Sequence, residues 1–246
     1  GGARLIDTAP MYTEEGTVGA AVRAAGVSRD ELWLSTKVPT QNWHAPMGRP
    51  KEWALKSVEQ SLHAMGLTYL DSIFLHMGPA QVALSNSVGP LAGGLGGGMG
   101  VAEYVEMWRG LEEARRRGQV RAIGVCMASR REIEALINAT GVVPDIAMTW
   151  LNPWVPAEQK QYVSWLKSKG IAVQVYGPLN FQGFWGASKR RRKAADLRLR
   201  AAQAAGRRHG ATYGQLALRW ILDQGVAFVT KISDRYLTED LGCQGF

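Results

Sequence analysis

Hydrophobic and polar residues follow two alternating patterns along this chain. Short apolar runs, typical of buried strands, alternate with longer stretches whose apolar residues recur every three or four positions, as in an amphipathic helix. Such alternation indicates parallel strands joined by right-handed helical crossovers. The predicted strands are the run through Leu5 and Ile6 that stops at Asp7, then Glu31–Lys37, Leu70–His76, Val120–Cys126, Asp145–Trp150, Ile171–Tyr176 and Val226–Lys231.

Helices are predicted between these strands. They cover Thr13–Ala25, Lys51–Met65, Val101–Arg117, Arg130–Ala139, Ala157–Lys169, a stretch near Ala194–His209, Tyr213–Gln224 and a short segment from Tyr236. Seven strands are one fewer than the eight that close a (β/α)8 barrel, and an open doubly wound sheet is the alternative. Because Gly1 lies at the foot of a strand, we expect an α/β (β/α)8 TIM barrel that is truncated at the N-terminus by one strand and one helix.

The composition favours one globular domain. The 246 residues are 46% hydrophobic and 20% charged, which suits a chain able to bury a core. We therefore expect a single domain over residues 1–246. A segment rich in Gly, Pro, Ala and Ser at residues 77–100 is predicted to be a flexible insertion over a site. Its Gly96–Gly98 run is not interpreted as a phosphate loop, because no Lys-Ser or Lys-Thr pair follows it.

The net charge of +8 suits an anionic partner. A phosphate-bearing cofactor and a nucleic acid both fit that sign. Much of the excess lies in Arg115–Arg117 and Lys189–Lys193, without the interleaved aromatic residues or the motif of a nucleic-acid reader, so no nucleic-acid partner is expected. No apolar run is long enough to cross a bilayer, and no membrane partner is expected either.

The two cysteines, Cys126 and Cys243, lie far apart and form no metal-binding or redox spacing. A reducing compartment is the simpler interpretation. We expect a cytoplasmic protein without a bound metal. The chain begins at Gly1 rather than Met, so this expectation leaves a preceding targeting segment open.

Ionisable side chains stand at the ends of three consecutive predicted strands. Asp7 closes the first, Lys37 the second and His76 the third, and Tyr12 follows Asp7 across a proline-containing loop. In parallel α/β proteins the carboxyl ends of the strands and the loops after them carry the chemistry. These four side chains are therefore candidates for one site. Taken alone, Asp7 could instead cap the helix that begins near Thr13.

The same stretches resemble the aldo-keto reductase family, over nearly the whole chain. The resemblance is carried by Gly2–Ala9 with Tyr12, Glu15 and Gly19, and by Ser35–Val38, Leu67–His76, Gly118–Val125, Gly170–Val173, Tyr176–Leu179 and Ala217–Trp220. It implies a (β/α)8 barrel that binds NADPH and reduces an aldehyde or ketone to an alcohol. It also implies that the C-terminal loop of the family is missing beyond Phe246.

The resemblance implies that Asp7, Tyr12, Lys37 and His76 form a proton-delivery site. Tyr12 would be the general acid that protonates the carbonyl oxygen. Its ordinary pKa of about 10 makes it a weak acid at neutral pH, and the Lys37 ammonium is expected to lower that pKa. Asp7 would keep Lys37 charged and in place. His76 would orient the carbonyl by a hydrogen bond.

The resemblance also implies contacts with the cofactor NADPH. The candidates are Tyr176, Gly177, Pro178, Leu179, Lys231 and Arg235. Tyr176 would stack on the nicotinamide, and Lys231 and Arg235 would bind the 2′-phosphate. The basic run Lys189–Lys193 is interpreted as a solvated helix start, with a contact to the cofactor pyrophosphate as the alternative.

Two residue pairs depart from the family pattern. The family usually has Ser-Asn after the strand that ends Ile-Gly-Val and Asn-Gln on the next strand, where they hold the carboxamide. This chain has Cys126-Met127 and Ala147-Met148, which lack strong hydrogen-bonding groups. An NADPH-dependent oxidoreductase is the leading prediction, and a non-catalytic barrel with a binding or regulatory role is the alternative. The carbonyl substrate and the oligomeric state are left open.

Overall fold

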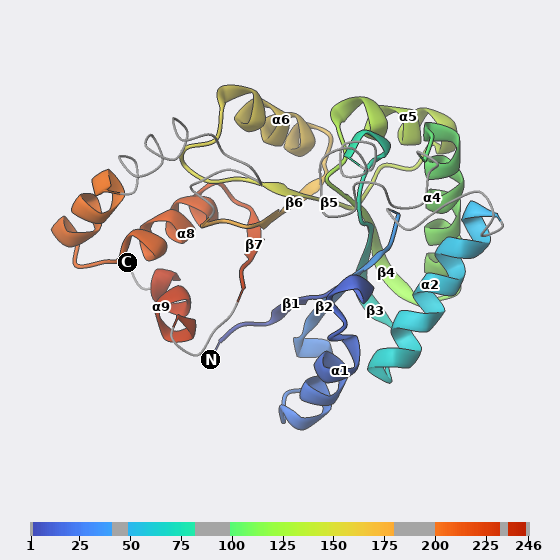
Figure 1. Ribbon diagram of the computed structural model, residues 1–246, viewed down its shortest axis with the longest axis horizontal. Coiled ribbons are helices and arrows are strands. Elements are labelled where there is room, and N and C mark those ends of the chain that lie inside the picture. The colour runs from blue at the N-terminus through green and yellow to red at the C-terminus, as the bar shows by residue number, and fades with distance from the viewer. Residues whose placement is uncertain (1, 41–48, 82–98, 180–199, 232–235, 245–246) are drawn as a thin grey trace, which may run out of the picture. The chain divides into compact units, whose positions relative to one another are not determined.

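The computed structural model describes residues 2–40, 49–81, 99–179, 200–231 and 236–244 (Figure 1). The contacts divide the chain into two compact units. The larger unit comprises residues 4–148 and 168–172, and the smaller one comprises residues 1–3, 149–167 and 173–246. The single domain expected from the composition stays a prediction.

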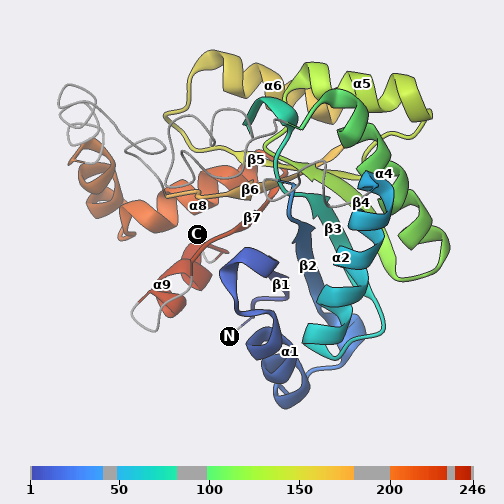
Figure 2. The same ribbon diagram turned by 45° about the vertical axis from the view of Figure 1, so that its right-hand side comes forward.

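Five parallel strands in chain order form the framework of the larger unit. They are β1 (Leu5–Asp7), β2 (Trp33–Val38), β3 (Leu70–Leu75), β4 (Val120–Cys126) and β5 (Ile146–Trp150). Each strand pairs with the next, and β1, β2 and β3 run side by side in Figure 2. Because the strands are parallel, their carboxyl ends meet at one edge of the sheet.

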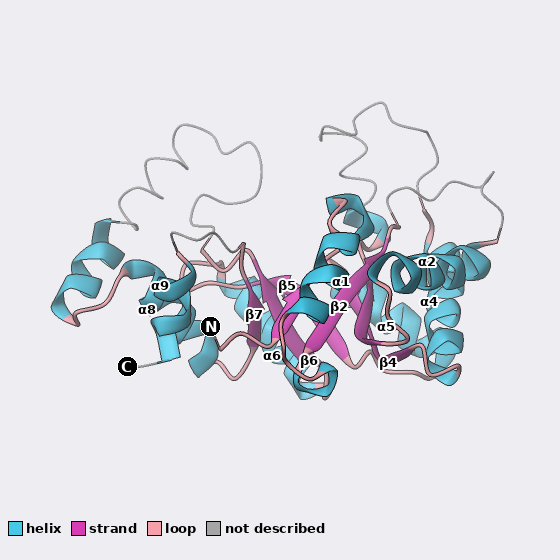
Figure 3. Cartoon of the chain, turned by 90° about the horizontal axis from the view of Figure 1, so that it is seen from below, coloured by secondary structure: helices cyan, strands magenta, loops and turns pink. Residues whose placement is uncertain are grey.

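Helices cover this sheet (Figures 1 and 3). They are α1 (Glu15–Ala24), α2 (Pro50–Met65), α4 (Val101–Arg116) and α5 (Arg130–Thr140), with the short 3-10 helices η1 (Pro10–Tyr12) and η2 (Arg29–Glu31). Two glycines permit close helix contacts. A Cβ atom at Gly19 would collide with the carbonyl group of Met65, and one at Gly110 would lie 2.7 Å from the Cβ of Ala54. The α1–α2 and α4–α2 contacts therefore require these small residues.

The strands β2, β3 and β4 are buried along almost their whole length. Continuous burial is expected of parallel strands that have both faces covered. The largest fully buried side chains include Phe74 and Ile73 of β3 and Trp108 and Tyr104 of α4. This apolar core fixes the strands, and hence the positions at which their carboxyl ends present polar residues.

The smaller unit contains α6 (Ala157–Ser168), β6 (Ala172–Tyr176), a helix over 200–208, α8 (Tyr213–Asp223), β7 (Ala227–Val229), α9 (Leu237–Leu241) and η4 (Gly242–Gln244). β6 and β7 are parallel, with Gln174 opposite Ala227. A capping box begins α8: the Thr212 hydroxyl accepts the Gln215 N–H at 3.1 Å, and the Gln215 side chain accepts the Thr212 N–H at 2.9 Å.

The alternation of parallel strands and helices in each unit belongs to the α/β (β/α)8 TIM-barrel class, as the sequence pattern predicts. Most element ends differ from the predicted ones by a residue or two. Thr13 is the clearest correction, because it ends η1 in the left-handed conformation, with φ of 60°, instead of beginning α1. Of the predicted insertion at 77–100, residues 82–98 lie outside the described part. No helix among the described residues is both long enough and apolar enough to span a membrane.

Candidate active site

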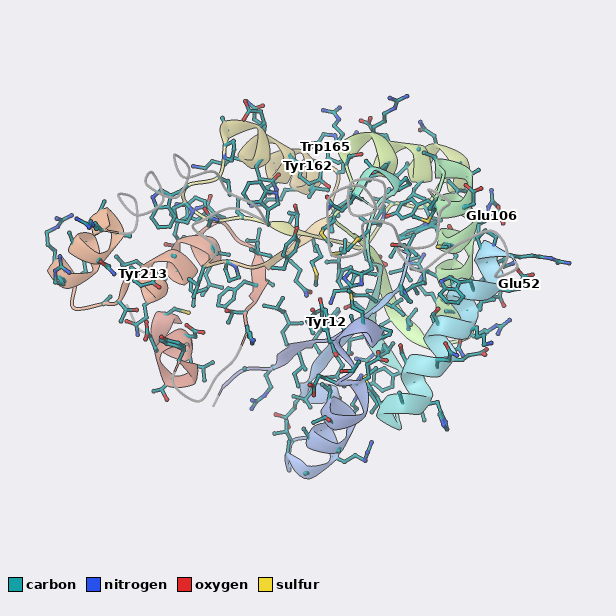
Figure 4. All side chains as sticks on the ribbon, viewed as in Figure 1. Tyr12, Glu52, Glu106, Tyr162, Trp165 and Tyr213 are labelled. Atoms are coloured by element: carbon teal, nitrogen blue, oxygen red, sulfur yellow. The ribbon has the colours of Figure 1, made fainter. Side chains whose placement is uncertain are left out.

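Four polar residues gather where β1, β2 and β3 end. Asp7 is the last residue of β1, Lys37 is the penultimate residue of β2, and His76 directly follows β3. Tyr12 lies on η1, the single turn of 3-10 helix after β1, and is labelled in Figure 4. All four belong to the larger unit. The structure therefore brings together the four residues that the sequence singled out.

Lys37 and Asp7 form a buried ion pair. Lys37 Nζ donates to Asp7 Oδ2 at 2.6 Å and to the carbonyl oxygen of Thr8 at 2.7 Å. Ser35 Oγ donates to Asp7 Oδ1 at 3.2 Å, so both carboxylate oxygens accept a hydrogen bond. A buried charge is tolerated when it is paired and hydrogen-bonded, as this one is. Asp7 is therefore a partner of Lys37 and does not cap a helix, since α1 has no side-chain cap.

The pKa values of this pair follow from burial and mutual attraction. Burial raises the pKa of Asp7, and the nearby Lys37 ammonium opposes that shift. Burial disfavours the charged form of Lys37, but the attraction of the Asp7 carboxylate and the hydrogen bond to it outweigh burial and raise the Lys37 pKa. Lys37 thus remains an ammonium group at neutral pH.

Tyr12 is the most exposed member of the group, with 45% of its surface accessible. Its ring centre lies 5.0 Å from Lys37 Nζ and 6.1 Å from the His76 ring, which it meets edge to face at 88°. Partial burial raises the pKa of Tyr12, although the Lys37 charge lowers it. The Lys37 ammonium therefore acts on the Tyr12 pKa in the expected direction, but desolvation of the ring outweighs it, and the net pKa lies above the ordinary value.

His76 is a neutral imidazole in this site. It is only 3% exposed, and burial together with the Lys37 charge lowers its pKa to about 3. Its backbone N–H donates to the carbonyl oxygen of Val38 at 3.1 Å, which continues the β2–β3 pairing by one residue. Its Nδ1 has no hydrogen-bond partner among the described residues. A neutral imidazole carries one N–H donor and one acceptor, so it can donate to an uncharged oxygen.

The end of β4 and the middle of β5 carry apolar side chains. Cys126 ends β4 opposite Met148 of β5, and both are buried. Burial raises the pKa of the Cys126 thiol to about 12, so it stays protonated. Met127 follows in the left-handed conformation, with φ of 50°. These positions therefore present sulfur and methyl groups in place of amide and hydroxyl groups.

The smaller unit contains a pocket of about 640 Å³. Its lining includes Leu179 and Lys231, two of the cofactor-binding candidates. Of the others, Tyr176 ends β6, Gly177 takes a φ of 55°, and Pro178 is buried, while Arg235 and Lys189–Lys193 lie outside the described residues.

The same pocket is lined by charged residues that sequence reasoning missed: Arg207, Glu239 and Asp240. Neither Arg207 nor Lys231 forms an ion pair with a carboxylate in the described part of the chain. Burial and the neighbouring Glu239 raise the pKa of Asp240. Thr212 and Tyr213, at the start of α8, complete one wall of the pocket. The only sequence signal for this wall is the Thr212–Gln215 capping pattern, which predicts a helix start but no ligand.

Comparisons with known proteins agree on one family. Residues 1–239 match the Aldo/keto reductase family. Methylglyoxal reductase DkgA of Salmonella typhimurium is 31% identical over 232 residues, which are 94% of this chain and 70% of that protein. The 2,5-diketo-D-gluconic acid reductase B of a Corynebacterium species is 30% identical over 233 residues, with coverage of 95% and 70%.

Solved structures give the same result. An aldo/keto reductase of Brucella melitensis has a TM-score of 0.76 and 24% identity, with coverage of 100% of this chain and 80% of that chain. An aldo-keto reductase of Bombyx mori in complex with NADP has a TM-score of 0.75 and 26% identity, with coverage of 99% and 74%. The parallel α/β fold is thus that of a (β/α)8-barrel oxidoreductase. The chain belongs to the aldo-keto reductase family.

Proposed function

We propose that this protein reduces a small aldehyde or ketone with NADPH, and that Tyr12, Lys37, Asp7 and His76 are its catalytic residues. The observation that carries this proposal is the buried Lys37–Asp7 pair, whose ammonium lies 5.0 Å from the centre of the Tyr12 ring. An ammonium held in this way stabilises negative charge that develops on a neighbouring oxygen. A purely structural role for the ion pair would not explain why the half-exposed phenol of Tyr12 lies beside it.

The pocket of the smaller unit fits the adenosine end of NADPH. Lys231 and Arg207 offer cations to a phosphate, while Glu239 and Asp240 offer carboxylate oxygens to hydroxyl or amino donors. A pocket lined by charges of both signs suits a ligand that carries an anionic group and hydrogen-bond donors together. An adenosine phosphate is such a ligand.

The nicotinamide end would be held with fewer polar bonds. The buried side chains of Cys126 and Met148 can pack against a ring but cannot fix a carboxamide by strong hydrogen bonds. Tyr176, at the end of β6, stays the candidate for the stacking contact that the resemblance to the family implies. We therefore expect the protein to bind NADPH chiefly through its adenosine phosphate end.

Tyr12 would deliver the proton. NADPH supplies a hydride when bound, and the carbonyl oxygen then needs a proton at the same face. Because the pKa of Tyr12 is raised, the phenol stays protonated at neutral pH and has a proton to give. The Lys37 ammonium stabilises the phenolate that remains after the transfer. The neutral His76 donates a hydrogen bond to the same carbonyl oxygen and orients it.

Asp7 completes the arrangement. Its carboxylate holds Lys37 Nζ in place and raises the Lys37 pKa, so the ammonium persists although both side chains are buried. Preorganised charge of this kind costs no rearrangement at the moment of reaction. The four residues therefore have separable roles: acid, charge stabiliser, counter-ion and carbonyl donor.

Small dicarbonyl compounds are the first substrates to try, because relatives at 30% and 31% identity are named for methylglyoxal and 2,5-diketo-D-gluconic acid. The test follows the absorbance of NADPH as the purified protein is mixed with methylglyoxal, and measures NADPH binding separately by fluorescence. We expect saturable binding and catalytic oxidation of NADPH. Binding without turnover of any carbonyl would favour the non-catalytic alternative, and the absence of binding would contradict the proposal.

A further inference from the structure

A single buried hydroxyl holds the backbone that directly follows His76. Thr40, two residues beyond the end of β2, is completely buried. Its Oγ1 accepts the Met77 N–H at 2.9 Å and donates to the Met77 carbonyl oxygen at 2.9 Å. One side chain thus satisfies both backbone groups of the first residue after His76.

This bridge extends the pairing of β2 and β3 past the ends of both strands. The regular register runs to Val38 opposite Leu75, and the His76 N–H donates to the Val38 carbonyl oxygen. Beyond that point the Thr40 hydroxyl makes the hydrogen bonds between the two segments that backbone groups make within the sheet. Lys37 lies on the same segment as Thr40, so the bridge joins the Lys37 strand to the His76 strand at the level of the site.

The segment after His76 is also hydrogen-bonded on the side away from β2. Gly78 N–H donates to the carbonyl oxygen of Met127 at 3.3 Å, and Ala80 N–H donates to Glu132 Oε1 at 2.7 Å. Without the Thr40 hydroxyl, the segment after His76 would therefore keep its hydrogen bonds toward β4 and α5 but lose those toward β2. We expect the backbone at Met77 to shift away from β2 and to carry the His76 ring with it.

We propose that Thr40 is a positioning residue for the reaction, acting through Met77 to fix the His76 ring relative to Lys37 and Tyr12. Thr40 touches no reacting atom. The proposal rests on the proposed function only in the role given to His76. A displacement of the ring by a fraction of an ångström is enough to weaken a catalytic hydrogen bond, because such bonds depend steeply on geometry.

Three variants separate hydrogen bonding from packing. Thr40→Val keeps the shape and removes the hydroxyl, whereas Thr40→Ser keeps the hydroxyl. Thr140→Val is the matched control, because the Thr140 hydroxyl also bridges backbone groups, donating to Leu136 at 2.8 Å and accepting from Val142 at 3.2 Å, but at the end of α5. If Thr40→Val does not fold, Thr40→Ala removes the same hydroxyl with less crowding.

Activity is the first measurement. For Thr40→Val we expect kcat for methylglyoxal to fall about tenfold while the Kd for NADPH changes less than twofold. Thr40→Ser and Thr140→Val should both stay within about twofold of the parent kcat. An unchanged kcat in Thr40→Val would overturn the proposal. So would an equal loss in Thr40→Ser, which would assign the effect to packing.

The second measurement needs neither cofactor nor turnover. The ¹⁵N resonances of the His76 ring, assigned by their loss in His76→Gln, are followed against pH. In the parent and Thr40→Ser the ring should stay neutral down to low pH. In Thr40→Val its resonances should shift, and the pKa of the ring should rise toward the ordinary value for histidine. Resonances that are identical in Thr40→Val and the parent would overturn the positioning role. If the parent protein reduces no carbonyl, the proposed function is contradicted. The ¹⁵N measurement would still show whether Thr40 positions the His76 ring.

Discussion

The Nζ atom of Lys37 lies 2.6 Å from Oδ2 of Asp7, and their side chains are only 2% and 9% exposed. Neither charge has much water to interact with, so each depends on the other and on the hydrogen bonds from Ser35 and to Thr8. Such pairs add little net stability compared with apolar residues of the same size, but they are costly to break. The stability of the fold therefore does not by itself account for this pair, which is consistent with the catalytic role proposed for Lys37.

Breaking the pair should destabilise the protein. Asp7→Asn keeps the size of the side chain but leaves the Lys37 ammonium buried without a counter-ion. We expect the free energy of unfolding in urea to fall by about 3 kcal/mol. Asp223→Asn, which breaks an exposed pair with Arg219, is the matched control and should cost less than about 1 kcal/mol. Similar losses in both variants would show that the Lys37 charge is not confined as described.

His76 should make the fold sensitive to acid. Its pKa is about 3 when folded and about 6.5 when unfolded, so between these values the unfolded chain binds the proton more strongly. The free energy of unfolding should therefore fall as the pH drops below about 6.5, by roughly 2 to 3 kcal/mol at pH 4.5 from this group alone. Above that range His76 contributes no pH dependence.

The measurement compares urea unfolding at several pH values in the parent and in His76→Gln. The variant should lose less stability than the parent between about pH 6.5 and 4.5. His63→Gln, at an exposed position near the end of α2, is the control variant for the substitution itself. Equal slopes in the parent and His76→Gln would contradict the neutral, buried state of His76.

Lys231 should decide between the phosphorylated and unphosphorylated cofactors. Lys231→Met removes a cation from the wall of the pocket, so the Kd for NADPH should rise about tenfold while the Kd for NADH changes less than twofold. Lys169→Met, at an exposed lysine that does not line the pocket, is the control. Fluorescence titration at fixed ionic strength measures both constants. A parallel loss for the two cofactors would place the phosphate elsewhere.

Polar side chains introduced at the end of β4 should strengthen the binding of the nicotinamide. Met127 adopts a left-handed conformation that asparagine tolerates better than most residues, so Met127→Asn fits the existing backbone. Together with Cys126→Ser it would offer a hydroxyl and an amide to the carboxamide. We expect a Kd for NADPH about three- to tenfold lower. Binding of 2′,5′-ADP, which lacks the nicotinamide, should be unchanged; an equal gain for both ligands would point to a general stabilisation.

The sequence predicted the placement of Asp7, Lys37 and His76 because each stands at or beside the end of a recognisable apolar run. Parallel pairing then brings such ends to one edge without further information. The position of Tyr12 was less predictable, since it depends on η1 and on the left-handed Thr13 that ends this turn. The sequence favoured a helix start at Thr13, and tertiary structure overrode it.

The electrostatics and the pocket were harder to predict. The sequence predicts the lowering effect of Lys37 on the Tyr12 pKa but not how far the ring is buried, and this burial raises the pKa by more than Lys37 lowers it. Arg207, Glu239 and Asp240 lie on helices whose pattern indicates only amphipathic character. Their common pocket depends on how those helices pack, which periodicity does not specify.

The most direct test of the proposed chemistry is the rate of methylglyoxal reduction by Tyr12→Phe. Tyr162→Phe is the matched control, because that tyrosine stacks on Trp165 in α6, as Figure 4 shows, and belongs to the other unit. Loss of the general acid should lower kcat by about 10²- to 10⁴-fold with an unchanged Kd for NADPH. Tyr162→Phe should keep the kcat of the parent. A Tyr12→Phe variant as active as the parent would contradict proton delivery by Tyr12.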